Sequence, residues 1–288
     1  MSPPSVAVAR AVADLRAQIS AWRRQAKSVA LVPTMGALHA GHVSLIKLAL
    51  AKAERVVVSI FVNPRQFNAA HDLARYPRQE AQDIATVGAA GGHLVFAPRE
   101  AEMYPPDFAT TVDVAGLSEA LCGAARPGHF KGVATVVAKL LLQTLPDIAV
   151  FGEKDYQQLF IIRRLVRDLD IPVAILSGPL VRDADGLALS SRNQNLRPHE
   201  RQIARALPAA LGEAVAALQA GDEVAAVLAA GRQRLLDAGF ASVDYFDLRD
   251  ARTLAPLAIL DRPGRVLAAG HVGEVRLIDN MAVAAVKA

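Results

Sequence analysis

Residues 55–62 read RVVVSIFV, a run of apolar side chains that follows Arg55 and is interrupted only by Ser59. Apolar and polar residues do not alternate here, which is typical of a strand buried on both faces of a parallel sheet. Shorter runs of this kind occur at residues 28–32, 93–96, 148–151 and 173–176, and we expect the first to end at Pro33. They alternate with helix-like segments at residues 6–22, 43–53, 80–90, 132–145 and 156–169. This alternation predicts a doubly wound parallel α/β sheet.

The pattern changes after Pro179. Residues 181–191 resemble a hairpin, with Asp185-Gly186 as its turn. Two Ala-rich helices are predicted at 198–220 and 222–237, and Pro208 should kink or interrupt the first. Short strand-like runs follow at 243–248, 265–269 and 274–278. We therefore expect two domains, a sheet domain over residues 1–180 and a smaller α+β domain over residues 181–288.

The composition agrees with a folded two-domain chain. The 288 residues are 52% hydrophobic and 21% charged, which excludes a disordered chain. The formal net charge of +4 permits anionic ligands but does not demand nucleic acid. The single cysteine, Cys122, excludes an internal disulfide framework and is interpreted as structural. No run of 18 apolar residues and no signal-peptide pattern occurs, so we predict a cytoplasmic protein with neither a membrane nor a nucleic-acid partner.

Polar clusters follow three of the predicted strands. Residues 33–42 read PTMGALHAGH, residues 63–67 read NPRQF and residues 152–158 read GEKDYQQ. Ligands of a parallel α/β sheet bind beyond the carboxyl ends of its strands. We therefore expect these clusters to open onto one crevice.

The pair His39 and His42 is the sharpest of these features. At the start of a helix the two rings share one face, beside unpaired N–H groups that suit a phosphate, and Gly41 lets the backbone approach closely. Two ordinary polar histidines at a helix start are the alternative. A zinc site would need a third ligand, and the His-Glu-x-x-His pattern is absent.

Neutral and charged groups fill the other clusters. Asn63 and Gln66 offer hydrogen bonds to hydroxyls or to a carboxylate, although Asn63-Pro64 could also simply make a turn. Lys154 supplies a compact positive charge for phosphate, and Asp155 could cap the helix; a surface ion pair is the alternative for these two residues.

Two further segments carry cations. Ser190, Ser191 and Arg192 could clamp a phosphate or form a plain turn. Residues 126–132, RPGHFKG, could be a lid or a surface loop. Neither Gly-x-x-x-x-Gly-Lys-Ser/Thr nor Gly-x-Gly-x-x-Gly occurs, so phosphate binding would use another device.

Taken together, five motifs resemble the pantoate–β-alanine ligase (pantothenate synthetase) family over about residues 28–280. They are PTMGALHAGH at 33–42, VSIFVNPRQF at 58–67, RPGHFKGV at 126–133, FGEKDYQQ at 151–158 and LSSRN at 189–193. The His-x-x-His element also resembles the HxGH motif of the wider nucleotidyltransferase superfamily. Ala40 stands where family members usually carry glutamate, and Leu189 where methionine is common.

The resemblance implies a Rossmann-like fold and an ATP-dependent ligation of D-pantoate with β-alanine. Pantoyl adenylate would be the intermediate, and AMP and pyrophosphate would be released. Mg²⁺ would accompany ATP, the second domain would close over the nucleotide, and the enzyme would be a homodimer.

Residue roles also follow from the resemblance. Catalytic roles fall on His39, His42, Lys154, Ser190 and Arg192. Pantoate binding falls on Met35, Asn63, Gln66 and Gln158. The same five catalytic residues would bind ATP together with Gly152, Asp155 and Ser191. Arg126 and His129 are possible contacts from the loop of residues 126–132, without an assigned ligand.

Three rival functions remain at this point. Another HxGH nucleotidyltransferase, which would transfer AMP or CMP to a phosphate substrate, would need cationic residues near that substrate. The residues expected there, Asn63, Gln66 and Gln158, are neutral and suit a hydroxy acid better. A non-enzymatic nucleotide-binding module would not need three polar clusters at one sheet edge. A zinc hydrolase built on His39 and His42 would contain the metal after purification.

Overall fold

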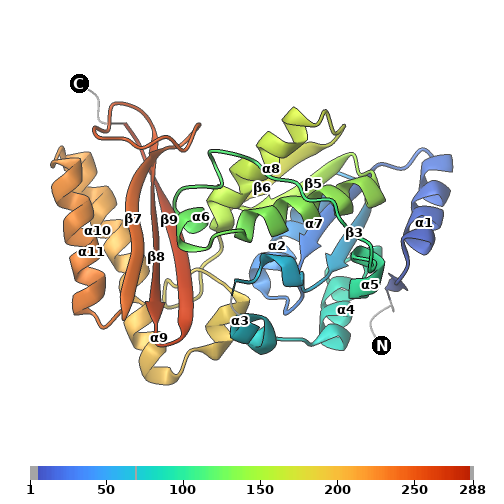
Figure 1. Ribbon diagram of the computed structural model, residues 1–288, viewed down its shortest axis with the longest axis horizontal. Coiled ribbons are helices and arrows are strands. Elements are labelled where there is room, and N and C mark those ends of the chain that lie inside the picture. Colours follow the sequence, from blue (N-terminus) through green and yellow to red (C-terminus); the bar gives the residue numbers. More distant parts are fainter. Residues whose placement is uncertain (1–5, 69, 286–288) are drawn as a thin grey trace.

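The strands of this protein form two separate sheets (Figure 1). A computed structural model describes residues 6–68 and 70–285. Six parallel strands in the N-terminal part lie in the order β1-β4-β3-β2-β5-β6. Their bounds are β1 Ala7–Ala9, β2 Val29–Thr34, β3 Arg55–Ile60, β4 Leu94–Phe96, β5 Ile148–Gly152 and β6 Ala174–Gly178.

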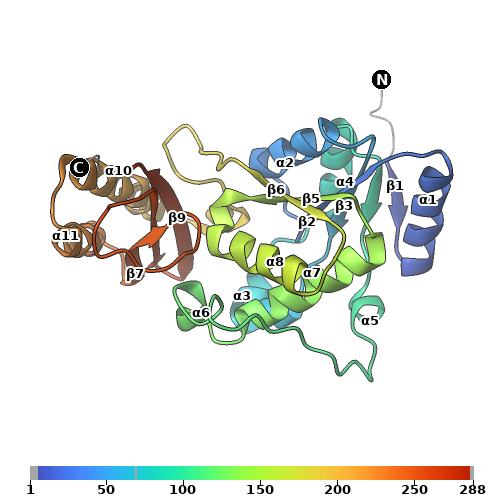
Figure 2. The ribbon, with the colours of Figure 1, turned by 90° about the horizontal axis from the view of Figure 1, so that it is seen from above.

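Helices cover both faces of this sheet (Figure 2). Helices α2 (Ala40–Leu50) and α4 (Glu80–Ala89) lie on one face. Helices α7 (His129–Thr144) and α8 (Tyr156–Asp168) lie on the other, where α1 (Val12–Arg24) packs against α7. The doubly wound prediction is therefore confirmed.

Strand residues alternate between two apolar cores. Leu31 and Val57 belong to the core beneath α7 and α8, whereas Val32 and Val58 belong to the core beneath α2. Because both faces are covered, both sets of side chains are mainly apolar. This explains why apolar residues at 56–62 do not alternate with polar ones, apart from the buried Ser59.

The strand order creates a ligand-binding position between β2 and β5. From β2 the chain moves outward through β3 and β4, and then returns to place β5 and β6 on the other side of β2. Loops at such a reversal diverge and leave a crevice at the carboxyl ends of the strands. The loop after β2 leads to His39 and His42 at the start of α2, and Lys154 lies in the connection that follows β5.

Two expectations for the sheet were wrong. Residues 6–22 are not one helix, since β1 comes first and pairs with β4 at the edge of the sheet. Pro33 does not end β2, which continues to Thr34. Within the register, β5 pairs with β2 only through Ala30 and Leu31, so the missing N–H of Pro33 breaks no bond to β5.

Short helices occupy the connections of the N-terminal part. They lack enough turns to show an apolar period, and the sequence did not predict them. They are η1 (Pro64–Gln66), α3 (Ala70–Arg75), α5 (Glu100–Met103), α6 (Cys122–Ala125) and η2 (Glu153–Asp155).

The C-terminal part is a three-stranded antiparallel sheet with helices on its outer face (Figure 1). Its strands are β7 (Ser242–Asp250), β8 (Gly264–Val272) and β9 (Val275–Val283). Helices α10 (Ala206–Ala220) and α11 (Val224–Asp237) pack on one face, which confirms the α+β prediction. The other face turns toward the six-stranded sheet.

Two local predictions in this part needed correction. Residues 181–191 form no pair of strands but one bridge, Arg182 to Ala188, around a turn with Gly186 at φ +85°. The Ala-rich helix breaks at Arg205, between α9 (Pro198–Ala204) and α10, and not at Pro208 itself. Pro208 lies in the first turn of α10, where a backbone N–H has no intrahelical partner, so proline is tolerated there.

No helix in the described part of the chain combines the length and the apolar character needed to cross a membrane.

Candidate active site

One cavity gathers every predicted site residue. It lies beyond the carboxyl ends of β2, β3 and β5 and is closed on one side by residues 179–192. Its walls include the predicted pantoate, nucleotide and loop residues, which are Met35, His39, His42, Asn63, Gln66, Arg126, His129, Gly152, Lys154, Asp155, Gln158, Ser190, Ser191 and Arg192. The clusters after the strands thus do open onto one crevice.

The two histidines at the start of α2 have defined tautomers. Nδ1 of His39 accepts a hydrogen bond from the backbone N–H of Gly41 at 3.2 Å, and Nδ1 of His42 accepts one from the N–H of His39 at 3.3 Å. Each ring therefore carries its proton on Nε2, which remains available as a donor. The ring centroids lie 4.1 Å apart.

Both rings are neutral at pH 7. Burial lowers the pKa of His39 to about 4, and the nearby Lys154 ammonium adds to this effect. Burial lowers the pKa of His42 to about 3, with a further contribution from His39. The pair thus offers two neutral N–H donors rather than two positive charges.

The loop before α2 is held by Asp83, a residue that the sequence did not single out. The residue is 1% exposed, and its carboxylate accepts hydrogen bonds from the backbone N–H groups of Ala37 at 2.9 Å and Leu38 at 2.8 Å. Asp83 lies on α4, where an acidic residue in a helix gives no sign of such a role. Gly36, at φ +81°, makes the tight turn that brings these N–H groups to the carboxylate.

A hydrogen-bond chain orients the amide of Gln66. The hydroxyl of Tyr104 donates to Oδ1 of Asn63 at 2.8 Å, and Nδ2 of Asn63 donates to Oε1 of Gln66 at 2.9 Å. Since Oε1 is occupied, Gln66 presents its Nε2 donors to the cavity. Burial raises the pKa of Tyr104 to about 12, which keeps the phenol protonated and able to donate.

The loop of residues 126–132 contacts η1 directly. A guanidinium nitrogen of Arg126 donates to the carbonyl of Gln66 at 3.1 Å, and Nδ1 of His129 donates to the same carbonyl at 2.8 Å. The other ring nitrogen, Nε2 of His129, lies 3.2 Å from Arg126 and accepts from it. His129 is the first residue of α7, and the loop lines the main cavity through Arg126 and His129.

The segment of residues 190–192 reaches the loop after β2 from the C-terminal side. The hydroxyl of Ser191 donates to the carbonyl of Ala37 at 3.0 Å, and that of Ser190 accepts the N–H of Arg192 at 3.3 Å. Arg192 forms a salt bridge with Asp72 at 2.9 Å. Asp72 lies on a short helix that the sequence did not predict.

Lys154 and Asp155 lie in η2, at the start of α8. Their charged atoms are 3.8 Å apart, and the Lys154 side chain is 21% exposed. Asp155 occupies the N-cap position, but its carboxylate caps no backbone N–H, so the proposed capping role is wrong. Its side chain remains directed to the cavity, which it lines together with Gln158.

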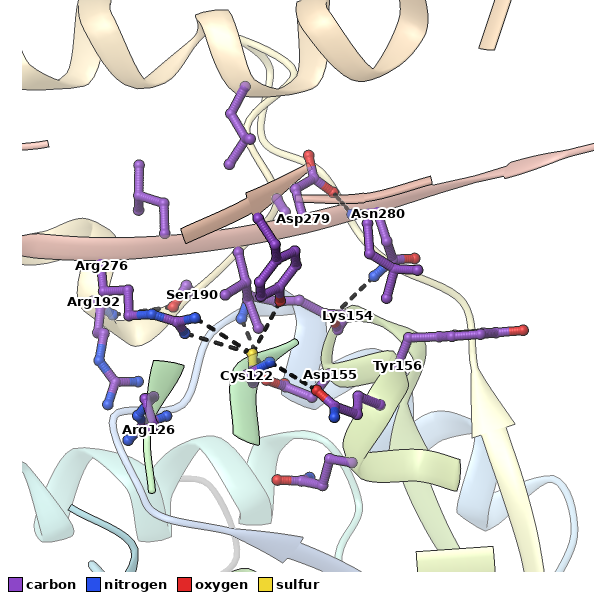
Figure 3. Close-up of a pocket in the computed structure, with 18 of the residues that line it drawn as sticks. Cys122, Arg126, Lys154, Asp155, Tyr156, Ser190, Arg192, Arg276, Asp279 and Asn280 are labelled. Atoms are coloured by element: carbon purple, nitrogen blue, oxygen red, sulfur yellow. Dashed lines mark hydrogen bonds and ion pairs between the residues drawn. The ribbon is translucent and has the colours of Figure 1, made fainter. Parts of the chain in front are cut away.

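A second cavity, lined in part by Cys122, lies between the two sheets (Figure 3). The thiol of Cys122 lies 3.0 Å from the hydroxyl of Tyr245 and 3.5 Å from the guanidinium of Arg276. Nδ2 of Asn280 donates to the carbonyls of Glu153 and Lys154, both at 3.0 Å. These contacts tie β7 and β9 to the loops of the six-stranded sheet.

Within residues 6–68 and 70–285, no group of three or more His, Cys, Asp or Glu side chains is arranged to hold a metal ion. The zinc alternative for His39 and His42 therefore finds no third ligand among these residues.

Comparison with known proteins identifies one family. Residues 7–282 match the model of the pantoate-beta-alanine ligase family. The chain is 60% identical over 279 residues to a pantothenate synthetase of Paramagnetospirillum magneticum, covering 97% of this chain and 98% of the relative. It is 56% identical over 280 residues to a pantothenate synthetase of Chelativorans sp., covering 97% and 99%.

Solved structures show the same similarity. Pantothenate synthetase from Thermus thermophilus superposes with a TM-score of 0.90 at 46% identity, covering 96% of this chain and 99% of that chain. Pantoate-beta-alanine ligase from Francisella tularensis, complexed with beta-gamma ATP and beta-alanine, superposes with a TM-score of 0.83 at 35% identity, covering 96% and 97%.

Proposed function

This chain belongs to the pantoate-beta-alanine ligase family, a ligase of pantothenate biosynthesis, and we propose that its main cavity joins the substrates in two steps. In the first step, the carboxylate of D-pantoate attacks the α-phosphate of ATP and pyrophosphate leaves. In the second, the amine of β-alanine attacks the acyl carbon and AMP leaves. Family membership favours this ligation over the nucleotidyltransferase, binding-module and zinc-hydrolase alternatives.

Adenylation activates the carboxylate of pantoate for attack by an amine. A carboxylate is a poor electrophile because its oxygen is a poor leaving group. Attaching AMP turns that oxygen into a good leaving group and divides one difficult step into two. No enzyme nucleophile is required, which agrees with the absence of a nucleophile–base pair among the predicted site residues.

The two histidines would act on the phosphates as neutral donors. Their Nε2–H groups are free because both Nδ1 atoms accept backbone N–H groups. Donors held in place before the reaction need no reorganisation when charge develops on the α-phosphate and the leaving pyrophosphate. Each such donor typically contributes about 10²–10³-fold in rate.

Charged groups would complete the nucleotide site. Lys154 would neutralise phosphate charge, together with Arg192 and the hydroxyls of Ser190 and Ser191. Binding of a phosphate by Arg192 would compete with its present salt bridge to Asp72. The backbone at Gly152 and the carboxylate of Asp155 would lie against adenosine, where Asp155 suits a ribose hydroxyl.

Pantoate would lie at the opposite end of the cavity. The Nε2 donors of Gln66, set by Tyr104 and Asn63, suit the carboxylate and a hydroxyl of pantoate. Gln158 would supply a second amide, and the backbone near Met35 a further contact.

Mg²⁺ would enter with ATP as part of the substrate. It commonly binds through one or two carboxylates and the phosphates of a nucleotide. Because the described part of the cavity has no metal-binding cluster of its own, its donor set fits an ion carried by the triphosphate. Such an ion would neutralise the leaving pyrophosphate.

The remaining proposals concern the whole protein. Residues 1–180 would form the nucleotide- and pantoate-binding domain, and residues 181–288 a domain that closes over ATP and excludes water from the adenylate. A homodimer in the cytoplasm is proposed from the family, and Cys122, a free and buried thiol, suits that reducing compartment.

The observation that carries the two-step proposal is the meeting, in one cavity, of oriented neutral donors at Gln66 with the histidine pair and Lys154. The test is pantoate-dependent exchange of pyrophosphate into ATP in the absence of β-alanine. We expect exchange, and AMP on addition of β-alanine. No exchange, or formation of ADP, would contradict the proposal.

Two variants test which end of the cavity binds pantoate and which binds the phosphates of ATP. Gln66→Ala should raise the KM for pantoate much more than that for ATP, and His42→Ala should cut exchange while the protein stays folded. Equal losses for both ligands in Gln66→Ala would count against its role. Near-normal exchange in His42→Ala would do the same for the histidine.

A further inference from the structure

A third cavity adjoins the main one and is rich in arginine. Arg126 and Arg192 line both cavities and mark the place where they meet. Arg75, Arg197 and Arg276 also line the third cavity. Of the residues proposed to hold the phosphates, Arg192 lines the third cavity, whereas His39, His42, Lys154, Ser190 and Ser191 do not. The third cavity therefore approaches the reaction centre from a different side.

All but one of these guanidinium groups are paired with a carboxylate. The salt bridges are Arg75 with Glu274, Arg192 with Asp72 at 2.9 Å, Arg197 with Glu200 at 3.3 Å and Arg276 with Asp244 at 2.7 Å. Arg126 has no carboxylate within 4.0 Å among residues 6–68 and 70–285. It is the unneutralised cation where the two cavities meet.

The Arg126 side chain is held by neutral groups. One nitrogen donates to the carbonyl of Gln66 and another to Nε2 of His129. His129 can accept this bond because its Nδ1 carries the proton and donates to Gln66. Burial, together with the adjacent Arg126, lowers the pKa of His129 to about 3, so the imidazole stays neutral and keeps its acceptor.

The guanidinium of Arg126, where the two cavities meet, is suited to bind an anion. Burial, with Arg192 and Arg276 nearby, lowers the pKa of Arg126 to about 10, which still leaves it charged at pH 7. The Arg126 side chain is partly buried, and a partly buried charge without an ion-pair partner is costly, so a bound anion would reduce that cost. Two of the five guanidinium N–H groups are used, so three remain for a ligand. A planar carboxylate matches that arrangement of donors.

We propose that Arg126 binds the carboxylate of the amino-acid substrate, β-alanine, with His129 as its positioning residue. This inference rests on the proposed two-step function. The amino acid reacts only after the adenylate has filled the main cavity, so it needs a separate approach. The third cavity provides one, and Arg126 stands where that approach meets the pantoate end of the site, next to Gln66.

The two half-reactions test this assignment separately. Arg126→Gln should raise the KM for β-alanine by about 30-fold or more, the usual effect of losing a charge-assisted hydrogen bond to a carboxylate. Pantoate-dependent pyrophosphate exchange, which needs no β-alanine, should fall much less than overall turnover measured at low β-alanine concentration. Arg197→Gln is the matched control, because Arg197 lines the same cavity but is paired with Glu200 and its side chain is 72% exposed. Its KM for β-alanine should not change.

An analogue shows which part of the substrate Arg126 recognises. 3-Aminopropanamide keeps the amine of β-alanine but replaces the carboxylate with a neutral amide. The wild-type enzyme should prefer β-alanine strongly in kcat/KM, and Arg126→Gln should lose most of that preference. An equal loss for both amines would overturn the proposal. A loss of exchange as large as the loss of overall activity would also overturn it and assign Arg126 to the nucleotide instead.

The role of His129 has its own readout. His129→Gln keeps an acceptor for Arg126 and a donor for the Gln66 carbonyl, so it should retain most of the affinity for β-alanine. His129→Leu keeps neither and should raise that KM with little change in kcat. Equal behaviour of the two variants would contradict positioning through hydrogen bonds. Absence of exchange in the wild-type protein would instead refute the two-step function, so the two failures are distinguishable.

Discussion

At the scale of single residues, the site depends on neutral polar groups whose orientation is set by neighbours. Hydrogen bonds keep the imidazole rings of His39, His42 and His129 in single tautomers. The amide of Gln66 is oriented by a hydrogen-bond chain that starts at Tyr104. Such groups discriminate ligands because a buried donor left without its partner costs about 1–3 kcal/mol. Their partners therefore matter as much as the groups themselves.

Tyr104→Phe tests the chain that orients Gln66. It removes one hydroxyl donor, so Oδ1 of Asn63 loses its shortest hydrogen bond. The N–H of Arg65 still donates to Oδ1 of Asn63 at 3.3 Å, so the amide is weakened in its orientation and not released. We expect the KM for pantoate to rise about threefold to tenfold, which corresponds to the loss of about one net hydrogen bond. The KM for ATP should stay within about twofold, and steady-state kinetics with each substrate varied would measure both.

Tyr156→Phe is the matched control for this variant. The Tyr156 hydroxyl donates to the carbonyl of Ala251 at 2.9 Å, outside the Asn63–Gln66 chain. It loses the same chemical group but should leave the KM for pantoate unchanged. A pantoate effect of the same size in both variants would refute the orienting role of Tyr104.

At the scale of elements, the site depends on the close packing of α7 against η1. A Cβ atom on Gly132 of α7 would lie 2.2 Å from the carbonyl oxygen of Arg65 and 2.7 Å from Cα of Gln66. The carbonyl of Gly132 also accepts from Nδ2 of Asn63 at 3.1 Å. Only glycine lets the helix approach the backbone that carries Gln66.

Gly132→Ala should push η1 away from α7. We expect a loss of about 1–3 kcal/mol in the free energy of unfolding, the usual cost of overpacking, and a higher KM for pantoate. The control is Gly212→Ala in α10, because a Cβ there meets nothing within 4 Å. It should stabilise the protein by about 0.5–1 kcal/mol through helix propensity. Urea unfolding measures both, and a Gly132→Ala protein as stable as the wild type would contradict the packing argument.

At the scale of the whole molecule, the cavities lie where the two sheets meet. Asn280 of β9 bonds to the carbonyls of Glu153 and Lys154, and Ser191 bonds to the loop after β2. The residues that join the two parts are therefore next to the residues that face the ligands. Movement of the C-terminal part would change the nucleotide site directly.

Buried neutral histidines should make global stability depend on pH. The pKa of His129 is about 3 in the folded protein, below the ordinary value of 6.5, and those of His39 and His42 are lowered as well. Between about pH 4 and 6.5 the unfolded chain therefore binds more protons, so the free energy of unfolding falls as pH falls through this window. At pH 5 the buried His129 alone should contribute about 2 kcal/mol less than at pH 7.

Urea unfolding of wild type and His129→Gln at pH 7 and pH 5 measures this contribution. The variant should lose about 2 kcal/mol less than the wild type between the two values, since all other titrating groups are shared. An identical pH dependence in the two proteins would mean that His129 is not a buried neutral group.

The sequence by itself determined the repeated strand–helix pattern, the change of pattern near residue 180 and fourteen of the residues that line the main cavity. These features depend on short stretches of sequence. A strand buried on both faces needs a largely apolar run, and the loops that follow parallel strands lie at the same edge of the sheet. The motif after each strand therefore pointed to the site before any contact was known.

The tertiary structure alone decided which side chains orient the site. Tyr104 and Asn63 are 41 residues apart, and Asp83 and Ala37 are 46 apart, so no local period connects them. The short strand β1 and the short helices in the loops also lacked enough residues to show a pattern. The sequence does not show that Arg126 lacks a carboxylate partner while the neighbouring arginines form salt bridges. Ion pairing depends on distance in space and not on distance along the chain.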